Sequence, residues 1–293
     1  MSRPAEPPAA RRMRFTAVVN PAAGAGRAAT IMIGLARSLR ELGADVRVGY
    51  SRSLGHATEL AAGAAGRTVL AVGGDGLVGA VAAAVAGTAT ELAVVPAGRG
   101  NDLARAVPPP TAAGLLSAPS RAIDVAEANG RVVIGSVCAG LDAAANDAAN
   151  RWRLPRRPIA YQLAAAGVLA RWRPVDYDLV VDGEPMRLRG HTVVVANCPW
   201  YGGALRVAPA ARLDDGLLDL VTVGAIARHR LVPVLAAMRR GTHVDLPGIT
   251  CRRIREITIG TSRPTPIYAD GEPLTAAPMT VRVRPAAVRL VGA

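Results

Sequence analysis

The chain contains no lysine, so all 35 of its basic residues are arginines. A Walker-type phosphate site and a Schiff-base enzyme both need a lysine, and the sequence excludes both classes. Aromatic residues are also scarce, at 3% of the chain with a single phenylalanine. No aromatic stacking platform, zinc pattern or helix-turn-helix pattern accompanies the net charge of +13. We therefore expect no nucleic-acid partner.

Cysteine and long apolar runs are equally limited. The three cysteines, Cys138, Cys198 and Cys251, are odd in number and lack metal-ligand spacing, which favours a reduced cytoplasmic compartment. No apolar signal segment follows the basic start of the chain. The longest stretch of low charge, 77–98, contains Glu91 and several glycines and does not suit a membrane span. The charge fits an anionic bilayer surface, so we expect a cytoplasmic protein that is peripheral at the inner face of the membrane.

The remaining composition predicts two lobes. The chain has 293 residues, of which 51% are hydrophobic, enough for a core built from valine, leucine and alanine. Apolar strand patterns alternate with helical patterns in the first part, which predicts an open parallel sheet with helices on both faces. The expected strands are 15–19, 45–50, 67–72 and 92–96, and the expected helices are 28–42, 56–65 and 77–86.

A β-rich lobe follows. The expected strands are 122–128, 132–138, 176–181, 187–197, 217–223, 254–259, 267–269 and 279–283. Asp182-Gly183 predicts a hairpin turn between two of them. The expected domains are a basic flexible tail at 1–12, an α/β lobe at 13–120 and a β lobe at 121–283.

Three glycine-containing loops follow three strands of the first lobe. They are Asn20 to Gly24, Gly73-Gly74-Asp75-Gly76, and Gly98-Arg99-Gly100-Asn101-Asp102. Taken alone, the Gly73-Gly74-Asp75-Gly76 loop could equally be a βα turn with a capping aspartate. Carboxyl ends of adjacent parallel strands form the crevice where ligands bind, and glycines let main-chain N–H groups approach an anion. Together the loops predict a phosphate-binding edge.

These loops, with Asp270-Gly271-Glu272, Tyr201-Gly202-Gly203, Ala208-Pro209 and 213–219, resemble the diacylglycerol kinase catalytic family, which includes bacterial lipid kinases and sphingosine kinases. The resemblance covers nearly the whole chain. It implies a Rossmann-like N-terminal lobe of the NAD kinase/diacylglycerol kinase type and a C-terminal antiparallel β-sandwich, with 284–293 returning to complete the first lobe. It also implies ATP and Mg²⁺.

The resemblance assigns roles to individual residues. Glu272 would accept a proton from the acceptor hydroxyl, Asp270 is its partner or rival, and Asp75 is a further catalytic carboxylate acting on the nucleotide or its magnesium, as Asp102 would. The residues expected at the nucleotide are Asn20, Pro21, Gly24, Ser51, Gly73, Gly74, Asp75, Gly76, Leu77, Gly98, Arg99, Asn101 and Asp102. By itself, the Asp270-Gly271 pair also reads as a hairpin turn.

Two further acidic positions match the family. Asp124 matches an aspartate at the lobe junction, although alone it reads as the end of a surface strand. The acidic loop 212–219 would hold a structural cation through the Asp215 carboxylate and the carbonyls of Arg212 and Leu217, a donor set that suits a hard ion. An Asp-Gly turn is the alternative there.

Segment 151–173 has arginines and aromatics at both ends of an apolar middle, which suits either a bilayer interface or a helix packed on the β lobe. The chain departs from the family pattern at Leu77, at Gly79-Ala80 and at Arg99. The sequence thus predicts a lipid kinase that phosphorylates diacylglycerol or a related lipid at a membrane surface. A catalytically weakened nucleotide- or lipid-binding protein and a kinase of a non-lipid molecule are the alternatives, and a homodimer stays open.

Overall fold

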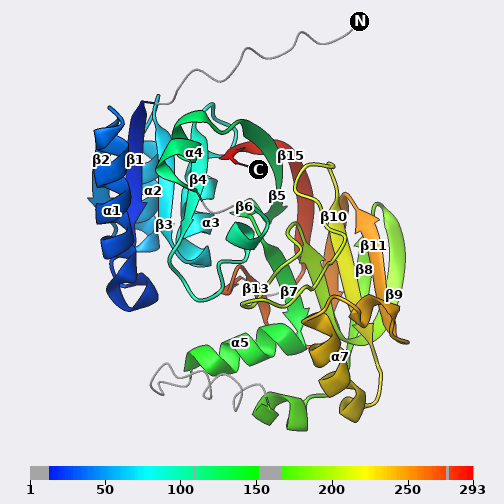
Figure 1. Ribbon diagram of the computed structural model, residues 1–293. Helices are drawn as coiled ribbons and strands as arrows, with labels where there is room; N and C mark the ends of the chain where they lie inside the picture. Colours follow the sequence, from blue (N-terminus) through cyan, green and yellow to red (C-terminus); the bar gives the residue numbers. More distant parts are fainter. Residues whose placement is uncertain (1–12, 108–109, 152–165, 275–276, 293) are drawn as a thin grey trace, which may run out of the picture. The chain divides into compact units, whose positions relative to one another are not determined.

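The protein forms two compact units (Figure 1). The structure, a computed structural model, describes residues 13–107, 110–151, 166–274 and 277–292. Unit 1 takes in the chain up to Ile123 and again from Ala286, and unit 2 takes in Asp124–Pro285. Strands β5 (Ser120–Ala128) and β15 (Met279–Val291) each run from one unit into the other. The tail expected at 1–12 and most of segment 151–173 lie outside the described residues.

Unit 1 contains a parallel sheet in the order β2-β1-β3-β4, to which the end of β15 adds beside β4. Its strands are β1 (Arg14–Val19), β2 (Asp45–Tyr50), β3 (Thr68–Gly73) and β4 (Glu91–Pro96). Its helices are α1 (Arg27–Glu41), α2 (Leu54–Ala62), α3 (Asp75–Val85) and α4 (Ala112–Ser117), with short 3₁₀ turns η1 (Ala23–Gly26) and η2 (Leu103–Arg105). The predicted alternation of strand and helix is confirmed, because each buried apolar run pairs in parallel as expected.

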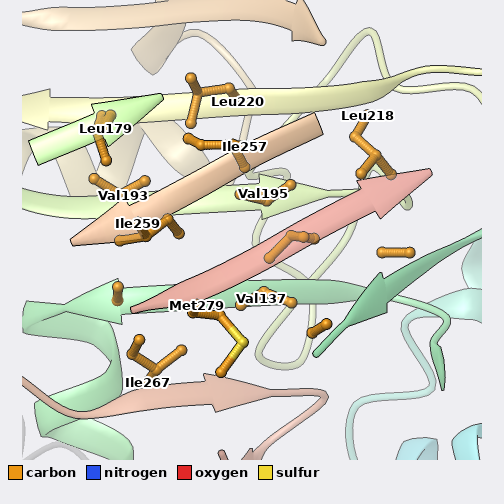
Figure 2. Packing of buried hydrophobic residues seen from close by; sticks show 14 of the residues in the cluster. Val137, Leu179, Val193, Val195, Leu218, Leu220, Ile257, Ile259, Ile267 and Met279 are labelled. Carbon is orange, nitrogen blue, oxygen red and sulfur yellow. The ribbon is translucent and has the colours of Figure 1, made fainter. Parts of the chain in front are cut away.

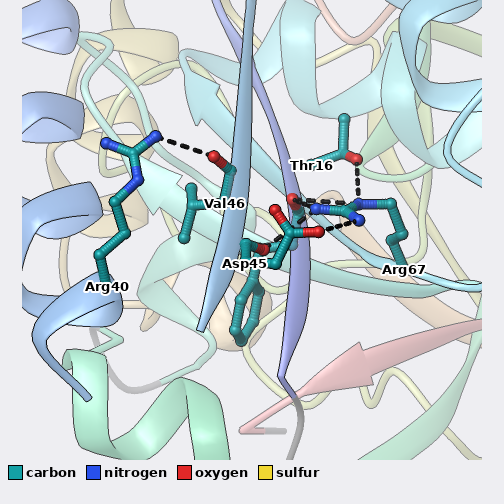
Figure 3. A network of polar contacts seen from close by, with 6 residues as sticks. Thr16, Arg40, Asp45, Val46 and Arg67 are labelled. Carbon is teal, nitrogen blue, oxygen red and sulfur yellow. Dashed lines mark hydrogen bonds and ion pairs between the residues drawn. The ribbon is translucent and has the colours of Figure 1, made fainter. Parts of the chain in front are cut away.

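The core of unit 1 packs α1 and α4 against the sheet. Phe15, Met32, Leu39 and Leu70 are completely buried there. At the amino ends of the strands, Arg67 is buried and donates to the carbonyl oxygens of Phe15 and Asp45 and to the Asp45 carboxylate (Figure 3). The ion pair and the carbonyl contacts hold β1, β2 and β3 together at this edge.

Unit 2 is antiparallel throughout its described strand pairs, which confirms the predicted β-sandwich. Its further strands are β6 (Arg131–Val133), β7 (Ser136–Gly140), β8 (Val175–Val181), β9 (Glu184–Ala196), β10 (Leu218–Gly224), β11 (Ile249–Ile254), β12 (Glu256–Thr261), β13 (Ile267–Ala269) and β14 (Glu272–Pro273). The helices are α5 (Leu141–Arg151) and α7 (Leu231–Met238), with 3₁₀ turns η3 (Arg228–Arg230) and η4 (His243–Asp245).

Side-chain alternation along the strands builds two cores in unit 2. Val193 and Val195 of β9 enter the cluster between the strand layers, where they meet Leu220 and Ile257 (Figure 2). Val194 points to the opposite cluster, which α7 covers through its buried residues. Because successive strand residues face opposite sides, one strand supplies both cores.

Three expectations for the β lobe need correction. The strand expected at 132–138 is two strands, β6 and β7, because the N–H of Gly135 between them donates to the Asp270 carboxylate instead of to a ladder. The last strand does not end at 283 but continues to Val291. Strand β11 was not expected, because four exposed residues separate its buried ends Ile249 and Ile254 and hide any alternation.

Candidate functional site

The three glycine loops lie at one edge of the unit 1 sheet. The register pairs Val19 with Val72 and Val72 with Val95, so β1, β3 and β4 end at the same level. The N–H of Asn20 donates to the Val72 carbonyl at 3.1 Å, and the N–H of Ala97 donates to Gly73 at 2.8 Å. The sequence prediction that these loops meet is therefore confirmed for unit 1.

The loops pack backbone against backbone. A Cβ on Gly24 would lie 2.5 Å from the Ala97 carbonyl oxygen, and Gly24 itself has a φ of +60°. A Cβ on Gly98 would collide with the Cα of Gly74. Real Cβ atoms do not approach so closely, so both positions require glycine for space, and Gly24 also requires it for its backbone conformation.

Asp75 ties two of the loops together. It begins α3, and its two carboxylate oxygens accept the N–H groups of Asn101 and Asp102 at 2.8 and 2.6 Å. A Cβ on Gly100 would lie 2.5 Å from the Asp75 Oδ2. Asp75 thus sets the distance between the end of β3 and the loop after β4, a positioning role that leaves lone pairs for a cation.

Asn101 shapes the loop after β4 from within. It adopts a positive φ of 52°, and its side chain bonds both the N–H and the carbonyl of Gly98, at 2.8 and 3.1 Å. Asn20 works in the same way in the first loop, where its side-chain oxygen accepts the N–H of Ala22 at 3.0 Å. Pro21 is exposed beside it. These amides hold loop geometry that local backbone preference would not favour.

Two other expected nucleotide residues are buried. Ser51 donates its hydroxyl to the Val19 carbonyl at 3.2 Å. Leu77 is 2% exposed, and its side chain fills the space beside Gly73. Leu77 therefore packs the start of α3 against β3.

The first turn of α3 lies at this edge of the sheet. The first hydrogen bond of the helix runs from the N–H of Val78 to the carbonyl of Gly74, at 3.1 Å. The N–H groups of Asp75, Gly76 and Leu77 therefore precede the helical ladder. Exposed arginines surround the edge at Arg27, Arg52, Arg99 and Arg105. Sequence reasoning missed Arg27 and Arg52, although their places directly after Gly26 and Ser51 were the available signal.

In unit 2, the two carboxylates of the Asp270-Gly271-Glu272 turn differ in their contacts. Asp270 has a φ of +48°, and its carboxylate accepts the N–H groups of Ile134, Gly135 and Ser136, each at 3.0 Å. Glu272 begins β14 and is exposed, and no hydrogen bond or ion pair of its side chain is found among the described residues. Asp270 is a fixed anchor for the turn, and Glu272 extends from it.

The acidic loop at 212–219 also involves Asp124. Asp124 is 3% exposed and accepts the N–H of Gly216 at 2.7 Å, so it supports this loop and is not a surface strand end. Asp215 Oδ1 accepts the N–H of Leu217 at 3.1 Å, whereas its buried Oδ2 lacks a hydrogen bond and lies 3.8 Å from the Arg253 guanidinium. No cluster of three or more histidine, cysteine or acidic side chains with metal-binding geometry occurs in the described chain.

Burial changes the acidity of neighbouring groups in unit 2. The pKa of Asp219 is raised to about 6, mainly by desolvation, which the charge of Arg253 opposes and the nearby carboxylate of Asp215 reinforces. Burial likewise raises the pKa of Asp142, whose carboxyl accepts the Tyr201 hydroxyl at 3.0 Å and the Thr192 hydroxyl at 3.3 Å. The Tyr201-Gly202-Gly203 motif therefore attaches its loop to α5.

Comparison with known proteins decides the family. A family model described as the diacylglycerol kinase catalytic domain matches residues 14–137, and one described as the YegS C-terminal NAD kinase beta sandwich-like domain matches residues 135–292. The diacylglycerol kinase of Mycobacterium tuberculosis strain H37Rv is 31% identical, covering 95% of this chain and 94% of its own. This chain belongs to the diacylglycerol kinase catalytic family. It is accordingly an ATP-dependent phosphotransferase with an alcohol acceptor, as the residue motifs predicted.

Other relatives agree with the family. A diacylglycerol kinase of Bacillus subtilis is 24% identical over 88% of this chain and 89% of its own. A crystal structure of a Bacillus anthracis diacylglycerol kinase has a TM-score of 0.70 at 18% identity and covers 96% of this chain and 97% of that one. A second Bacillus anthracis structure reaches 0.80 at 20% identity, covering 100% and 98%. The solved structures confirm the two-part fold of the family. Among the described residues, every helix is too short or too polar to cross a bilayer.

Proposed function

We propose that this kinase transfers the γ-phosphate of ATP to a hydroxyl of diacylglycerol or a closely related lipid, and that it does so as a peripheral protein at the inner face of a membrane. The observation that carries the proposal is the close packing of three glycine loops at one sheet edge, with Asp75 tying two of them together. Family relatives named as diacylglycerol kinases supply the acceptor class.

The nucleotide phosphates would lie on the main-chain donors of this edge. The first-turn N–H groups of α3 carry the positive end of the helix dipole, which favours an anion. Arg27, Arg52, Arg99 and Arg105 would supply the charge that lysine supplies in other phosphate sites, and their guanidinium groups can bind phosphate oxygens in pairs. Asn20, Pro21 and Ser51 would complete the cradle around the same strands.

Mg²⁺ would accompany the nucleotide, because phosphoryl transfer needs a cation to neutralise charge on the β- and γ-phosphates. Asp75 and Asp102 supply carboxylate oxygens, which are the donors that this hard ion prefers. A second, structural cation would bind at the Asp215 carboxylate with the carbonyls of Arg212 and Leu217. The buried Asp215 Oδ2 without a hydrogen bond supports that site, since a buried carboxylate oxygen ordinarily has a partner.

Glu272 would be the general base. It would take the proton from the acceptor hydroxyl as the oxygen forms a bond to the γ-phosphorus, while the bond from that phosphorus to the bridging oxygen of ADP breaks. The three N–H contacts of Asp270 would keep the turn in the shape that presents Glu272. Asp270 would then be a positioning residue, and its three N–H contacts support Glu272, rather than Asp270, as the base.

Transfer of labelled phosphate from ATP to a total lipid extract in mixed micelles tests the function. We expect a labelled lipid with the native chain and a loss of about two to four orders of magnitude in kcat for Glu272→Gln, with little change in the KM for ATP. Glu256→Gln, another exposed glutamate of unit 2, is the matched control. Asp270→Asn should lower both the melting temperature and the activity, because one of its N–H contacts becomes donor against donor.

Other results of this transfer assay would lead to different conclusions. Full activity of Glu272→Gln would place the base elsewhere. If the native chain binds ATP but labels no lipid, the acceptor is water-soluble or turnover has been weakened by the changes at Leu77, Ala80 and Arg99. Trials with short polyols in place of the extract separate these two cases.

The structural cation has its own test. Mg²⁺ should raise the melting temperature of the native chain, and Asp215→Ala should lower that temperature and abolish its dependence on Mg²⁺. Asp214→Ala, at the adjacent acidic position, is the control. An unchanged Mg²⁺ response in Asp215→Ala would rule the site out.

A further inference from the structure

Helix α7 exposes two large apolar side chains. Its residues Leu231, Val234 and Met238 are buried on unit 2, as an amphipathic helix requires. Val232 and Leu235, however, are 60% and 49% exposed. They lie three positions apart and therefore share one face of the helix. Scattered apolar side chains on a surface are ordinary, so the pair acquires meaning only from its surroundings.

Those surroundings are strongly basic. Arg228 and Arg230 precede α7, Arg239 and Arg240 follow it, and all four are exposed. Positions 232, 235 and 239 follow α-helical spacing along one stripe, and Arg228 precedes this stripe in the 3₁₀ turn η3. The sequence contains no acidic residue between Asp219 and Asp245. The stripe thus combines an apolar centre with cationic ends.

A second basic segment adjoins this stripe. The Arg228 guanidinium donates to the carbonyl of Ala170 at 2.8 Å. Directly after Ala170 come Arg171 and Arg173, both exposed, on either side of the half-buried Trp172. The Arg263 guanidinium lies 5.4 Å from the centroid of the Trp172 ring and donates to the Arg173 carbonyl at 2.6 Å. The basic surface therefore extends from α7 across 171–173 to Arg263.

We propose that the outer face of α7, together with 171–173, is the surface by which this kinase docks on an anionic lipid bilayer. Val232 and Leu235 would enter the boundary between headgroups and acyl chains, and Arg228, Arg239 and their neighbours would bind lipid phosphates. The choice of a membrane rests on the proposed lipid-kinase function, and the surface itself rests on the contacts and exposures above.

Charge and polarity favour this occupant over two others. A nucleic acid would bind the arginines but would leave Val232 and Leu235 against water and phosphate, and Trp172 already stacks on Arg263. A second copy docked through the same face would bring arginine clusters together, and like charges facing each other oppose association. An anionic bilayer offers both a negative surface and an apolar interior.

Sedimentation of the whole chain with vesicles tests the surface in the absence of ATP. Vesicles of phosphatidylcholine with phosphatidylglycerol should bind the native chain more tightly than vesicles of phosphatidylcholine alone, and added salt should weaken that binding. The double variant Val232→Ser with Leu235→Ser should partition about tenfold less. Arg239→Gln with Arg240→Gln should lose about fivefold per arginine and much of the salt dependence.

Ile33→Ser is the matched control, since Ile33 is 63% exposed on α1 of unit 1. It should leave partitioning within about twofold of the native value. Circular dichroism and the melting temperature must show that every variant is folded. Equal losses in the control and in the α7 variants, or no loss in either α7 variant, would overturn the proposal.

Three further results separate this inference from its rivals and from the proposed function. If the native chain bound a DNA duplex as tightly as vesicles, and the variant Arg239→Gln with Arg240→Gln lost that binding, the surface would be assigned to a nucleic acid instead. If the native chain self-associated, and the variant Val232→Ser with Leu235→Ser did not, the surface would be assigned to a second copy of the chain. If the native chain labelled no lipid but still sedimented with anionic vesicles through α7, the proposed lipid-kinase function would be wrong and the docking surface would stand.

The variant Val232→Ser with Leu235→Ser should still phosphorylate a dispersed short-chain diacylglycerol, because the substitutions affect binding to the bilayer and not the reaction.

Discussion

At each end of the strands in the unit 1 sheet, one charged side chain forms hydrogen bonds with backbone groups. The charge is positive at the amino ends, the amino edge, and negative at the carboxyl ends, the carboxyl edge. At the amino edge Arg67 donates to the carbonyls of Phe15 and Asp45, at 2.7 and 3.0 Å (Figure 3). At the carboxyl edge Asp75 accepts the N–H groups of Asn101 and Asp102. Arg67 is buried among polypeptide, whereas Asp75 lies partly exposed among glycine loops.

We infer from this difference that the amino edge stabilises the sheet and that the carboxyl edge would bind the nucleotide. The Arg67 guanidinium is buried and makes its hydrogen bonds within the protein, so it is not available to a ligand. At the carboxyl edge, the Asp75 carboxylate accepts donors of one loop, and the first-turn N–H groups of α3 still precede the helical ladder. Unit 2 repeats the second arrangement, because Asp270 accepts three successive N–H groups beside the exposed Glu272.

The largest effect is expected from Asp75→Asn. The amide keeps the size of the carboxylate, but its nitrogen must face the N–H of Asn101 or Asp102, and that contact becomes donor against donor. We expect the loops to separate and kcat/KM for phosphate transfer from ATP to fall by about two to three orders of magnitude, since a misplacement of about 1 Å already costs about a hundredfold. Steady-state transfer at saturating lipid measures it.

Asp45→Asn makes the same chemical change at the opposite edge and serves as the control. Its activity should stay within about twofold of the native value. If the two variants lost activity equally, the division between a stabilising edge and a binding edge would be wrong.

A smaller effect, on stability alone, is expected from Arg67→Met. The methionine keeps the apolar stem but removes the donors of the Phe15 and Asp45 carbonyls and the ion pair with the Asp45 carboxylate, so the free energy of unfolding should fall by about 2 kcal/mol or more. Chemical denaturation followed by circular dichroism measures the loss. Arg47→Met, at an exposed position of β2, should cost less than about 0.5 kcal/mol. A large drop in kinase activity of folded Arg67→Met at low temperature would contradict the comparison.

Much of the fold follows from local sequence, because strand and helix periodicity act over a few residues. Strand β2 lies where predicted, and the Asp182-Gly183 turn joins β8 and β9 with positive φ at both residues, as a tight hairpin requires. The edge where the glycine loops gather follows from the parallel order of the strands. These features need no knowledge of distant partners.

The contacts that give the site its shape could not be predicted in the same way. Gly135 donates to Asp270 across 135 positions of sequence, and Gly216 donates to Asp124 across 92. A pattern of residues predicts an acidic turn but does not identify which distant N–H groups bind it, because that depends on the register of the whole sheet. For the same reason Asp124 read as a strand end, and the separate roles of Asp270 and Glu272 stayed open.

The smallest effect is a pH dependence at the amino edge. The hydrogen bond from Arg67, helped by the charges of Arg67, Arg47 and Arg14 and opposed by desolvation, lowers the pKa of Asp45 below its usual 3.8. A depressed carboxyl pKa contributes stability above the unfolded value and loses it as pH falls through the folded value. The melting temperature of the native chain should therefore exceed that of Asp45→Asn near neutral pH, and the gap should close below about pH 4. Asp178→Asn, which breaks only an exposed pair with Arg187, should show no such gap. A gap that persists in acid would mean that the Asp45 carboxylate does not stabilise this edge through its charge, and the amino edge would then depend on the Arg67 contacts to carbonyls alone.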